Sequence, residues 1–268
     1  KNAKHPLLLI GAGANRKEAR RAISEFISRI GVPFCNTQMG KGVVDESSNY
    51  FLGTAALSDK DYLHDYIKMS DLIVNIGHDV VEKPPFFMEH GGTRVIHINY
   101  KSAQVDQVYF PQIEVVGDIA LSVDKLSDAI GSKLPLDLTD FETVRDNVKD
   151  KIFQLGDEAT FPMQPQSIVS EIRKLMGYHD IIALDNGVYK IWFARNYLAY
   201  QPNTILLDNA LATMGAGLPS AMLAAMIYPS RKVMSICGDG GFMMNSQEIE
   251  TAVRLNLNMV VLILNDNS

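Results

Sequence analysis

The chain has 268 residues, of which 47% are hydrophobic and 21% are charged, so it is long enough for two globular domains. Its formal charge of −6 argues against a nucleic-acid partner, because no basic stripe is present to contact a phosphate backbone. No apolar run reaches membrane-spanning length, which argues against a membrane partner, and the composition indicates a cytoplasmic metabolic protein. Cys35 and Cys237 are too few for a zinc site and are expected as buried free thiols.

The first half of the chain alternates strand-sized apolar runs with helical patterns. Residues 7–10 form an apolar run, and the helix after it should bury six side chains on one face: Ala19, Ala22, Ile23, Phe26, Ile27 and Ile30. Later elements are expected as strands at 32–36, 71–77, 94–99 and 115–118, and as helices at 61–68 and 119–130. This alternation predicts a parallel sheet covered on both faces, and hence a doubly wound, Rossmann-like domain over residues 1–130.

A proline-containing segment, residues 131–166, is expected to connect this domain to a second one, and it includes a charged, helix-like stretch at 140–154. The second α/β pattern covers residues 167–268, with helices at 167–176, 214–227 and 246–255 and strands at 180–184, 232–237 and 259–264. The chain stops just past its last apolar strand, which would leave the edge of a sheet bare. We therefore expect this second doubly wound domain to be only the N-terminal part of a larger one.

The first candidate binding motif is Gly11-Ala12-Gly13, which follows a strand and opens a helix, as a dinucleotide fingerprint does. Arg16 stands where the fingerprint has its third glycine. Two interpretations remain. The loop offers backbone N–H groups to an anion, or its glycines only form a tight strand-to-helix turn, which the incomplete motif favours.

The second candidate is the run Gly238-Asp239-Gly240-Gly241, which follows the strand expected at 232–237. Asn245, with Glu248 three positions later, has the pattern of a helix N-cap. The sequence therefore predicts a unit of strand, glycine turn, helix and strand. A right-handed crossover of this kind makes its two strands parallel.

Asp239 follows the first of these strands, and Asp266 follows the second. The carboxyl ends of parallel strands share one edge of the sheet, where open α/β sheets bind ligands. Two carboxylates beside glycines that expose N–H groups suit a Mg²⁺ ion that holds a phosphate. The alternative is two surface aspartates in ordinary turns.

These motifs resemble those of thiamine-diphosphate-dependent enzymes of the acetolactate synthase family. Residues 211–219, Leu-Ala-Thr-Met-Gly-Ala-Gly-Leu-Pro, are similar to the segment that holds the aminopyrimidine ring in that superfamily. Residues 185–195 and 248–255 resemble the acetolactate synthase branch, and the first of them is similar to its diphosphate-side loop. Residues 1–130 resemble, more loosely, the central domain of the family.

The resemblance implies that Mg²⁺ is held by Asp239, Asp266 and the backbone carbonyl of Ser268. An aspartate at the second position is similar to the catabolic acetolactate synthases, whereas many relatives carry asparagine there. It also implies which residues bind the cofactor. The turn that begins at Gly238 and the facing loop would meet the diphosphate through Gly240, Gly241, Asn186, Gly187 and Val188.

Met214 corresponds to the bulky residue that props the cofactor in its bent form, although ordinary helix packing is the alternative. The backbone groups of Ala212 and Met214 correspond to those that bond the pyrimidine ring. The family's activating glutamate lies in a domain that precedes the central one. No catalytic residue is therefore expected in this chain, and this piece alone should be inactive.

The implied activity is a carboligation of 2-oxo acids, in which pyruvate is decarboxylated and condensed with a second pyruvate to 2-acetolactate, while the cofactor acts as an electron sink. The implied assembly is a homodimer or homotetramer. FAD, which some relatives hold in the central domain, remains open because of Gly11 and Gly13. The residues after Gly77 lack the arginine- and aspartate-rich run of flavin-binding relatives.

Two alternative functions remain. One is another thiamine-diphosphate-dependent decarboxylase or carboligase, and the other is a non-catalytic dinucleotide-binding module. The histidines suggest neither catalysis nor a metal site, because none has a partner at ligand spacing. His97 is expected in the core, and His78 and His90 in solvated loops.

Overall fold

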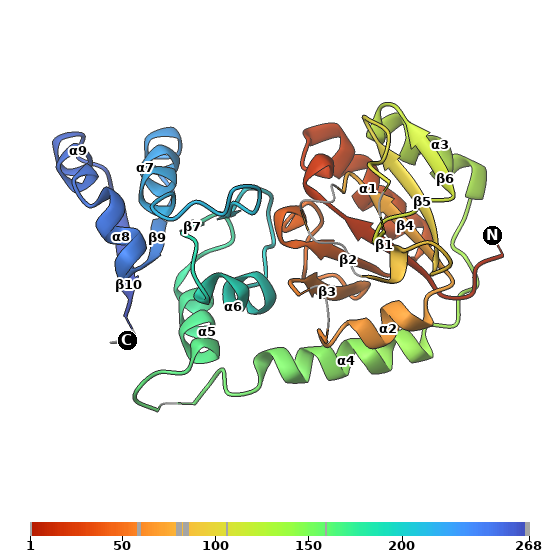
Figure 1. Ribbon diagram of the computed structural model, residues 1–268, viewed down its shortest axis with the longest axis horizontal. Helices are drawn as coiled ribbons and strands as arrows, with labels where there is room; N and C mark the ends of the chain where they lie inside the picture. Colours follow the sequence, from red (N-terminus) through yellow and green to blue (C-terminus); the bar gives the residue numbers. More distant parts are fainter. Residues whose placement is uncertain are drawn as a thin grey trace. The chain divides into compact units, whose positions relative to one another are not determined.

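The computed structural model describes residues 2–57, 60–78, 82, 86–105, 107–158 and 160–265 (Figure 1). The chain splits into two compact units, Lys1–Ile152 and Phe153–Ser268. Each unit contains a parallel sheet flanked by helices, so the predicted α/β fold class is confirmed. Among the helices in the described part of the chain, none combines the length and the apolar character needed to span a lipid bilayer.

The first unit contains a six-stranded parallel sheet in the order β3-β2-β1-β4-β5-β6. Its strands are β1 (Pro6–Ile10), β2 (Phe34–Thr37), β3 (Phe51–Ala55), β4 (Leu72–Ile76), β5 (Arg94–Asn99) and β6 (Ile113–Val116). The strand order changes direction between β1 and β4, which pair from Pro6 with Leu72 to Ile10 with Ile76. All of β1 is buried, which explains why its sequence is a continuous apolar run.

The helices of this unit are α1 (Lys17–Ile30), α2 (His64–Met69), α3 (Ile119–Ile130) and α4 (Thr139–Phe153), with short 3₁₀ turns η1 (Ala12–Ala14), η2 (Gln38–Gly40) and η4 (Phe86–Met88). Helix α1 buries all six apolar side chains that its periodicity predicted. It ends at Gly31, whose φ of 73° lies in the left-handed region and whose N–H group donates to the carbonyl of Ile27.

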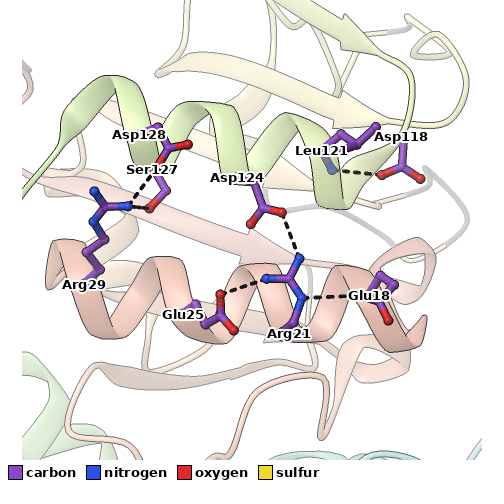
Figure 2. Close-up of polar contacts among 9 residues, drawn as sticks. All are labelled: Glu18, Arg21, Glu25, Arg29, Asp118, Leu121, Asp124, Ser127 and Asp128. Carbon is purple, nitrogen blue, oxygen red and sulfur yellow. Dashed lines mark hydrogen bonds and ion pairs between the residues drawn. The ribbon is translucent and has the colours of Figure 1, made fainter.

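Helices α1 and α3 lie side by side and are linked by ion pairs on their exposed surface (Figure 2). Arg21 of α1 contacts Asp124 of α3 at 2.8 Å, and Arg29 contacts Asp128 at 3.0 Å. Asp118 caps the first turn of α3. Because the paired charges are well exposed, they add little stability, and the buried apolar faces of the two helices hold them on the sheet.

Helix α4 lies within the segment 131–166 that was expected to connect two domains. It is charged on most of its surface, but Phe141, Val148 and Ile152 enter the same core cluster as Leu7 and Leu52 of the first sheet. These three apolar residues recur at helical spacing and form one narrow stripe. The first unit therefore extends to Ile152.

The second unit contains a four-stranded parallel sheet in the order β10-β9-β7-β8. Its strands are β7 (Ile181–Leu184), β8 (Ile205–Leu206), β9 (Val233–Gly238) and β10 (Val260–Leu264). Its helices are α5 (Pro165–Leu175), α6 (Tyr189–Asn196), α7 (Gly217–Ile227), α8 (Asp239–Asn245) and α9 (Glu248–Arg254). The apolar run of β7 is buried at every position and forms the centre of the core.

Several elements differ from the prediction. The helix expected from residue 214 begins at Gly217, because Gly215 has a φ of 85°. The helix expected at 246–255 is α9, and a separate short helix, α8, precedes it. The predicted cap at Asn245 is wrong, since α9 begins after Gln247 and Asn245 instead donates to the carbonyl of Gly215. Strands β3 and β8 and helix α6 were not predicted.

Candidate cofactor site

The carboxyl ends of β7, β9 and β10 lie at one edge of the second sheet, because the three strands are parallel neighbours. The pairing places Leu184 of β7 beside Ile236 of β9, and Gly238 of β9 beside Leu264 of β10. The segments that follow β7 and β9 therefore begin next to each other. Asp266 and Ser268, which follow β10, lie outside the described residues.

The glycine-rich segment after β9 forms the first turn of α8 rather than a loop. Asp239 and Gly240 are exposed, whereas Gly241 is buried. A Cβ atom on Gly241 would lie closer to the Asp185 carboxylate than any real contact allows, so only glycine fits there. A Cβ atom on Gly240 would meet only the Met214 Cε atom of the described structure, at 3.5 Å, so the space over Gly240 is open to a ligand.

Gly238 is fixed to the facing loop by Tyr189. Its N–H group donates to the Tyr189 hydroxyl at 2.9 Å. The Tyr189 ring also fills the space beside Gly187, where a Cβ atom would overlap the ring. Burial raises the pKa of Tyr189 above its ordinary value, and the hydrogen bond from Gly238 offsets part of that rise.

The segment that contains Met214 is held from two sides. The N–H group of Gly215 donates to both carboxylate oxygens of Asp185, at 2.8 and 2.9 Å. The carbonyl of Gly215 accepts from Asn245 Nδ2 at 2.6 Å, and the carbonyl of Thr213 accepts from Asn186 Nδ2 at 2.8 Å. Met214 itself is 44% exposed and lies before the start of α7 rather than inside a helix, and its Cε atom is 3.5 Å from where a Cβ atom on Gly240 would stand. This argues against helix packing as the role of Met214.

The predicted residues of the facing loop differ in exposure. Asn186 is buried, and its side-chain oxygen accepts from Lys190 Nζ, which also donates to the Asp208 carbonyl and to Asn209 Oδ1. Gly187 is exposed, and so is Val188, at 78%. Lys190 thus joins this loop to the segment that leads toward Met214.

Ala212 completes the set of predicted cofactor residues. It is exposed and has a φ of 49°, so its backbone departs from the strand and helix conformations. A single alanine in this conformation is uncommon, which points to a backbone held by its surroundings. The structure therefore brings together three predicted segments: the loop at 186–188, the segment at 212–214 and the turn at 238–241.

Sequence reasoning assigned no role at this site to Asp185, Tyr189 and Lys190, and it assigned Asn245 the role of a helix cap, which the structure contradicts. Their position gave one usable signal, because Asp185 directly follows a buried strand, where ligand-binding side chains gather. Each of these side chains has at least one partner 18 or more residues away in the sequence, and no local pattern could reveal those contacts.

The residues present fit part of a magnesium site. Asp239 offers an exposed carboxylate beside the first turn of α8, and carboxylate oxygens are the protein ligands that Mg²⁺ prefers. Within the described ranges, no three His, Cys, Asp or Glu side chains gather closely enough to hold a metal ion. Of the three predicted Mg²⁺ ligands, Asp239 is therefore the one that lies within the described residues.

The Gly11-Ala12-Gly13 loop of the first unit does not fit the diphosphate of FAD. Its N–H groups are already bonded: Gly11 to the Ile76 carbonyl, Ala12 to Glu82 Oε1 and Gly13 to the Gly77 carbonyl, at 2.9, 2.8 and 2.7 Å. A Cβ atom on Gly13 would lie 2.8 Å from the Gly77 oxygen. The glycines therefore let this turn pack on the end of β4, as the tight-turn interpretation holds.

The histidines differ in their surroundings. His97 lies in the core as predicted, with its Nδ1 atom 2.7 Å from the Tyr109 hydroxyl, and His90 is exposed as predicted. The prediction of a solvated His78 is wrong. Its side chain is buried, with the ring packed edge-on against Tyr109 and the Nδ1 atom 3.8 Å from Glu82 Oε2.

Cys35 and Cys237 are both buried free thiols, as predicted. Burial raises the pKa of Cys35 to about 12 and also raises that of Cys237. Neither thiol is therefore an accessible thiolate nucleophile, although Cys237 lies just before the candidate site.

The chain is similar to known thiamine pyrophosphate enzymes along most of its length. The family described as "Thiamine pyrophosphate enzyme, central domain" matches residues 1–126, and "Thiamine pyrophosphate enzyme, C-terminal TPP binding domain" matches residues 185–268. The second match covers the site described above, and the first covers the six-stranded sheet.

Three relatives illustrate the similarity. "Acetolactate synthase, catabolic" of Raoultella terrigena is 32% identical over 271 residues, which cover 99% of this chain and 48% of that protein. "Acetolactate synthase" of Bacillus subtilis (strain 168) is 30% identical over 279 residues, 99% of this chain and 47% of that protein. "Acetolactate synthase large subunit" of Pyropia yezoensis is 27% identical over 266 residues, which cover 97% of this chain and 45% of that protein. The chain thus spans about half the length of these curated relatives, and it belongs to the thiamine-diphosphate-dependent enzymes of the acetolactate synthase family.

Proposed function

We propose that the full-length protein is a thiamine-diphosphate- and Mg²⁺-dependent carboligase that converts two pyruvate molecules to 2-acetolactate and carbon dioxide. Relatives named acetolactate synthase along the whole chain support this reaction class. The observation that carries the site is that the Met214 Cε atom lies beside Gly240, 3.5 Å from where a Cβ atom on Gly240 would stand. The segment that resembles the pyrimidine-binding part of the family there meets the segment that resembles its diphosphate-binding part.

Different residues of the chain would bind the metal ion, the diphosphate and the pyrimidine ring of the cofactor. Asp239, with Asp266 and the carbonyl of Ser268, would hold Mg²⁺. The N–H groups of Gly240 and Gly241 lie in the first turn of α8, where backbone donors have no acceptor inside the helix, so they suit a diphosphate. Exposed backbone at Gly187 and Val188 would bind the same group from the facing loop.

Met214 and Ala212 would hold the pyrimidine side. The Met214 side chain projects from a backbone fixed on both sides of Gly215, so it can support a ring without moving. When bound, thiamine diphosphate supplies a ring that accepts the electron pair released as a 2-oxo acid loses carbon dioxide. The chain's own residues orient the reactants and exclude water around that ring.

We also propose that a second copy of the protein covers this site in a homodimer or homotetramer. Three large apolar side chains around the site are strongly exposed: Val188 at 78%, Leu211 at 86% and Met243 at 69%. Large apolar side chains exposed on segments that surround one site suit an interface. The activating glutamate would come from a preceding domain. Light scattering of the full-length protein tests the assembly, and a fully active monomer would contradict it.

The function is tested by titrating thiamine diphosphate into the full-length protein in a calorimeter, with and without Mg²⁺. Binding should require Mg²⁺ and should weaken strongly in Asp239→Ala. Asp266→Asn should be milder, since asparagine still offers an oxygen. Glu250→Gln is the control, because it alters an exposed carboxylate of α9 in the same unit. Unchanged affinity in Asp239→Ala would overturn the metal assignment.

Product analysis with pyruvate separates the proposed reaction from its nearest alternative. Acetolactate is the expected product, whereas acetaldehyde would identify a decarboxylase of the same family. Tight NAD or FAD binding without Mg²⁺-dependent thiamine diphosphate binding would indicate a dinucleotide-binding module. The bonded N–H groups of Gly11, Ala12 and Gly13 argue against that outcome.

A further inference from the structure

Asp185 is a fully buried carboxylate at the centre of the candidate cofactor site. Its Oδ1 atom accepts the N–H groups of Asn186, at 2.7 Å, and of Gly215, at 2.8 Å. Its Oδ2 atom accepts the Gly215 N–H group a second time, at 2.9 Å. One side chain therefore fixes both the loop after β7 and the segment that contains Met214.

Two further glycines pack directly on the same side chain. A Cβ atom on Gly217, at the start of α7, would lie 2.8 Å from the Asp185 Cβ atom. A Cβ atom on Gly241, in the first turn of α8, would overlap the Asp185 Oδ2 atom. The glycines let both helices approach the carboxylate, so Asp185 also sets the distance between α7 and α8.

From these contacts we infer that Asp185 is a positioning residue for cofactor binding, an inference that rests on the proposed function. It anchors Gly215, which has a φ of 85° and directly follows Met214, the residue whose Cε atom lies beside Gly240. An ionised carboxylate only accepts hydrogen bonds, and it binds N–H groups more strongly than a neutral amide does. Asp185 would thereby hold the pyrimidine side and the diphosphate side of the proposed site in place relative to each other.

Asp185→Asn tests this inference, because it keeps the size and one oxygen of the side chain but replaces the other oxygen with a donor. Asp180→Asn is a matched control at the opposite end of β7. Asp180 also accepts two backbone N–H groups, from Gly177 at 2.7 Å and Lys232 at 3.0 Å, but it lies away from the site.

Both variants of the full-length protein are compared with the wild type by calorimetric titration of thiamine diphosphate with Mg²⁺, and by the thermal midpoint of the cofactor-free protein. Asp185→Asn should weaken binding about tenfold to a hundredfold, the range expected for a disrupted hydrogen bond to a charged group. Asp180→Asn should lower the thermal midpoint but change the affinity by less than about twofold. An equal loss of affinity in both variants would reduce Asp185 to a structural role and overturn the inference.

If Asp185→Asn does not fold, a second variant still tests the inference. Asn245→Ala removes the other anchor of Gly215 from a partly exposed position, and it should also weaken binding. The inference would be overturned if Asn245→Ala bound the cofactor with wild-type affinity while Asp185→Asn was either unfolded or unchanged in affinity. That result would leave the proposed function standing. A wild type without Mg²⁺-dependent binding would instead overturn the proposed function and the inference with it.

Discussion

The Met214 side chain lies beside Gly240 at the candidate cofactor site, where a Cβ atom added to Gly240 would be 3.5 Å from the Met214 Cε atom. Both residues are exposed. This contact is ordinary van der Waals distance, so the protein itself has room for a small side chain at Gly240. If the proposed site is right, glycine is needed there because the cofactor would approach the backbone.

Gly240→Ala should therefore leave the cofactor-free protein as stable as the wild type, because alanine also favours a helix over glycine by about 1 kcal/mol. Its affinity for thiamine diphosphate should fall at least about tenfold if a close contact to the diphosphate is lost. Gly240→Val should abolish binding. Calorimetric titration and a thermal scan measure the two effects, and wild-type affinity in the valine variant would contradict the assignment.

Gly241→Ala is the complementary change. Its Cβ atom would overlap the Asp185 carboxylate, so we expect a loss of stability of about 1–3 kcal/mol, typical of overpacking in a core. The thermal midpoint should fall in the cofactor-free protein, in contrast to Gly240→Ala. A stable Gly241→Ala variant would show that Asp185 does not occupy the position described.

Tyr189→Phe should weaken the connection between the loop after β7 and the turn after β9. It removes the hydroxyl that accepts the Gly238 N–H group at 2.9 Å and keeps the ring beside Gly187. We expect a destabilisation of about 1 kcal/mol, the usual contribution of one such hydrogen bond. Hydrogen exchange at Gly238 measures the change, and exchange as slow as in the wild type would argue against the bond.

Lys41 and Glu46 form a buried ion pair in the first unit, with Nζ and Oε2 2.8 Å apart and side chains that are 1% and 0% exposed. Burial lowers the pKa of Lys41, and the charge of Glu46 opposes that shift. Lys41→Met should destabilise the unit by about 3–5 kcal/mol, because the carboxylate stays buried without its cation.

The double variant Lys41→Met with Glu46→Leu should recover most of this stability, since apolar pairs often replace buried ion pairs without loss. The full-length protein is unfolded in urea, and hydrogen exchange of the backbone N–H groups in β2 and β3 is measured to report the stability of this unit. Equal destabilisation in the single and double variants would contradict the explanation.

Asp71 should give the first unit a pH-dependent contribution to stability. Partial burial alone would raise the pKa of its carboxyl, but the N–H groups of Lys4 and His5 outweigh burial and hold the pKa below its ordinary value. The contribution is therefore complete above the unfolded pKa of about 3.9 and is lost as pH falls through the lower folded pKa. The difference in thermal midpoint between wild type and Asp71→Asn should be constant near neutral pH and shrink below about pH 4. A constant difference down to pH 2 would contradict this prediction.

The order of strands and helices was readable from the sequence, because buried parallel strands and amphipathic helices leave strong apolar patterns. Residues 7–10 and the stripe on α1 are examples. Strand β3 escaped prediction because Gly53 interrupts a short run whose burial comes from neighbouring strands and helices. Helix α4 looked like a connection because its apolar stripe is narrow, and only the core shows that it packs.

At the candidate site, the sequence by itself determined that Asp239 and its glycines follow a buried strand, since local patterns report local structure and motif spacing. Only the tertiary structure decided what those residues contact. It turned Asn245 from a predicted cap into a partner of Gly215, buried His78 against Tyr109 in the first unit, and placed Asp185 against Gly215 and Gly241. These contacts join segments that are far apart in the chain, and their geometry depends on how helices pack on the sheet rather than on any neighbouring residue.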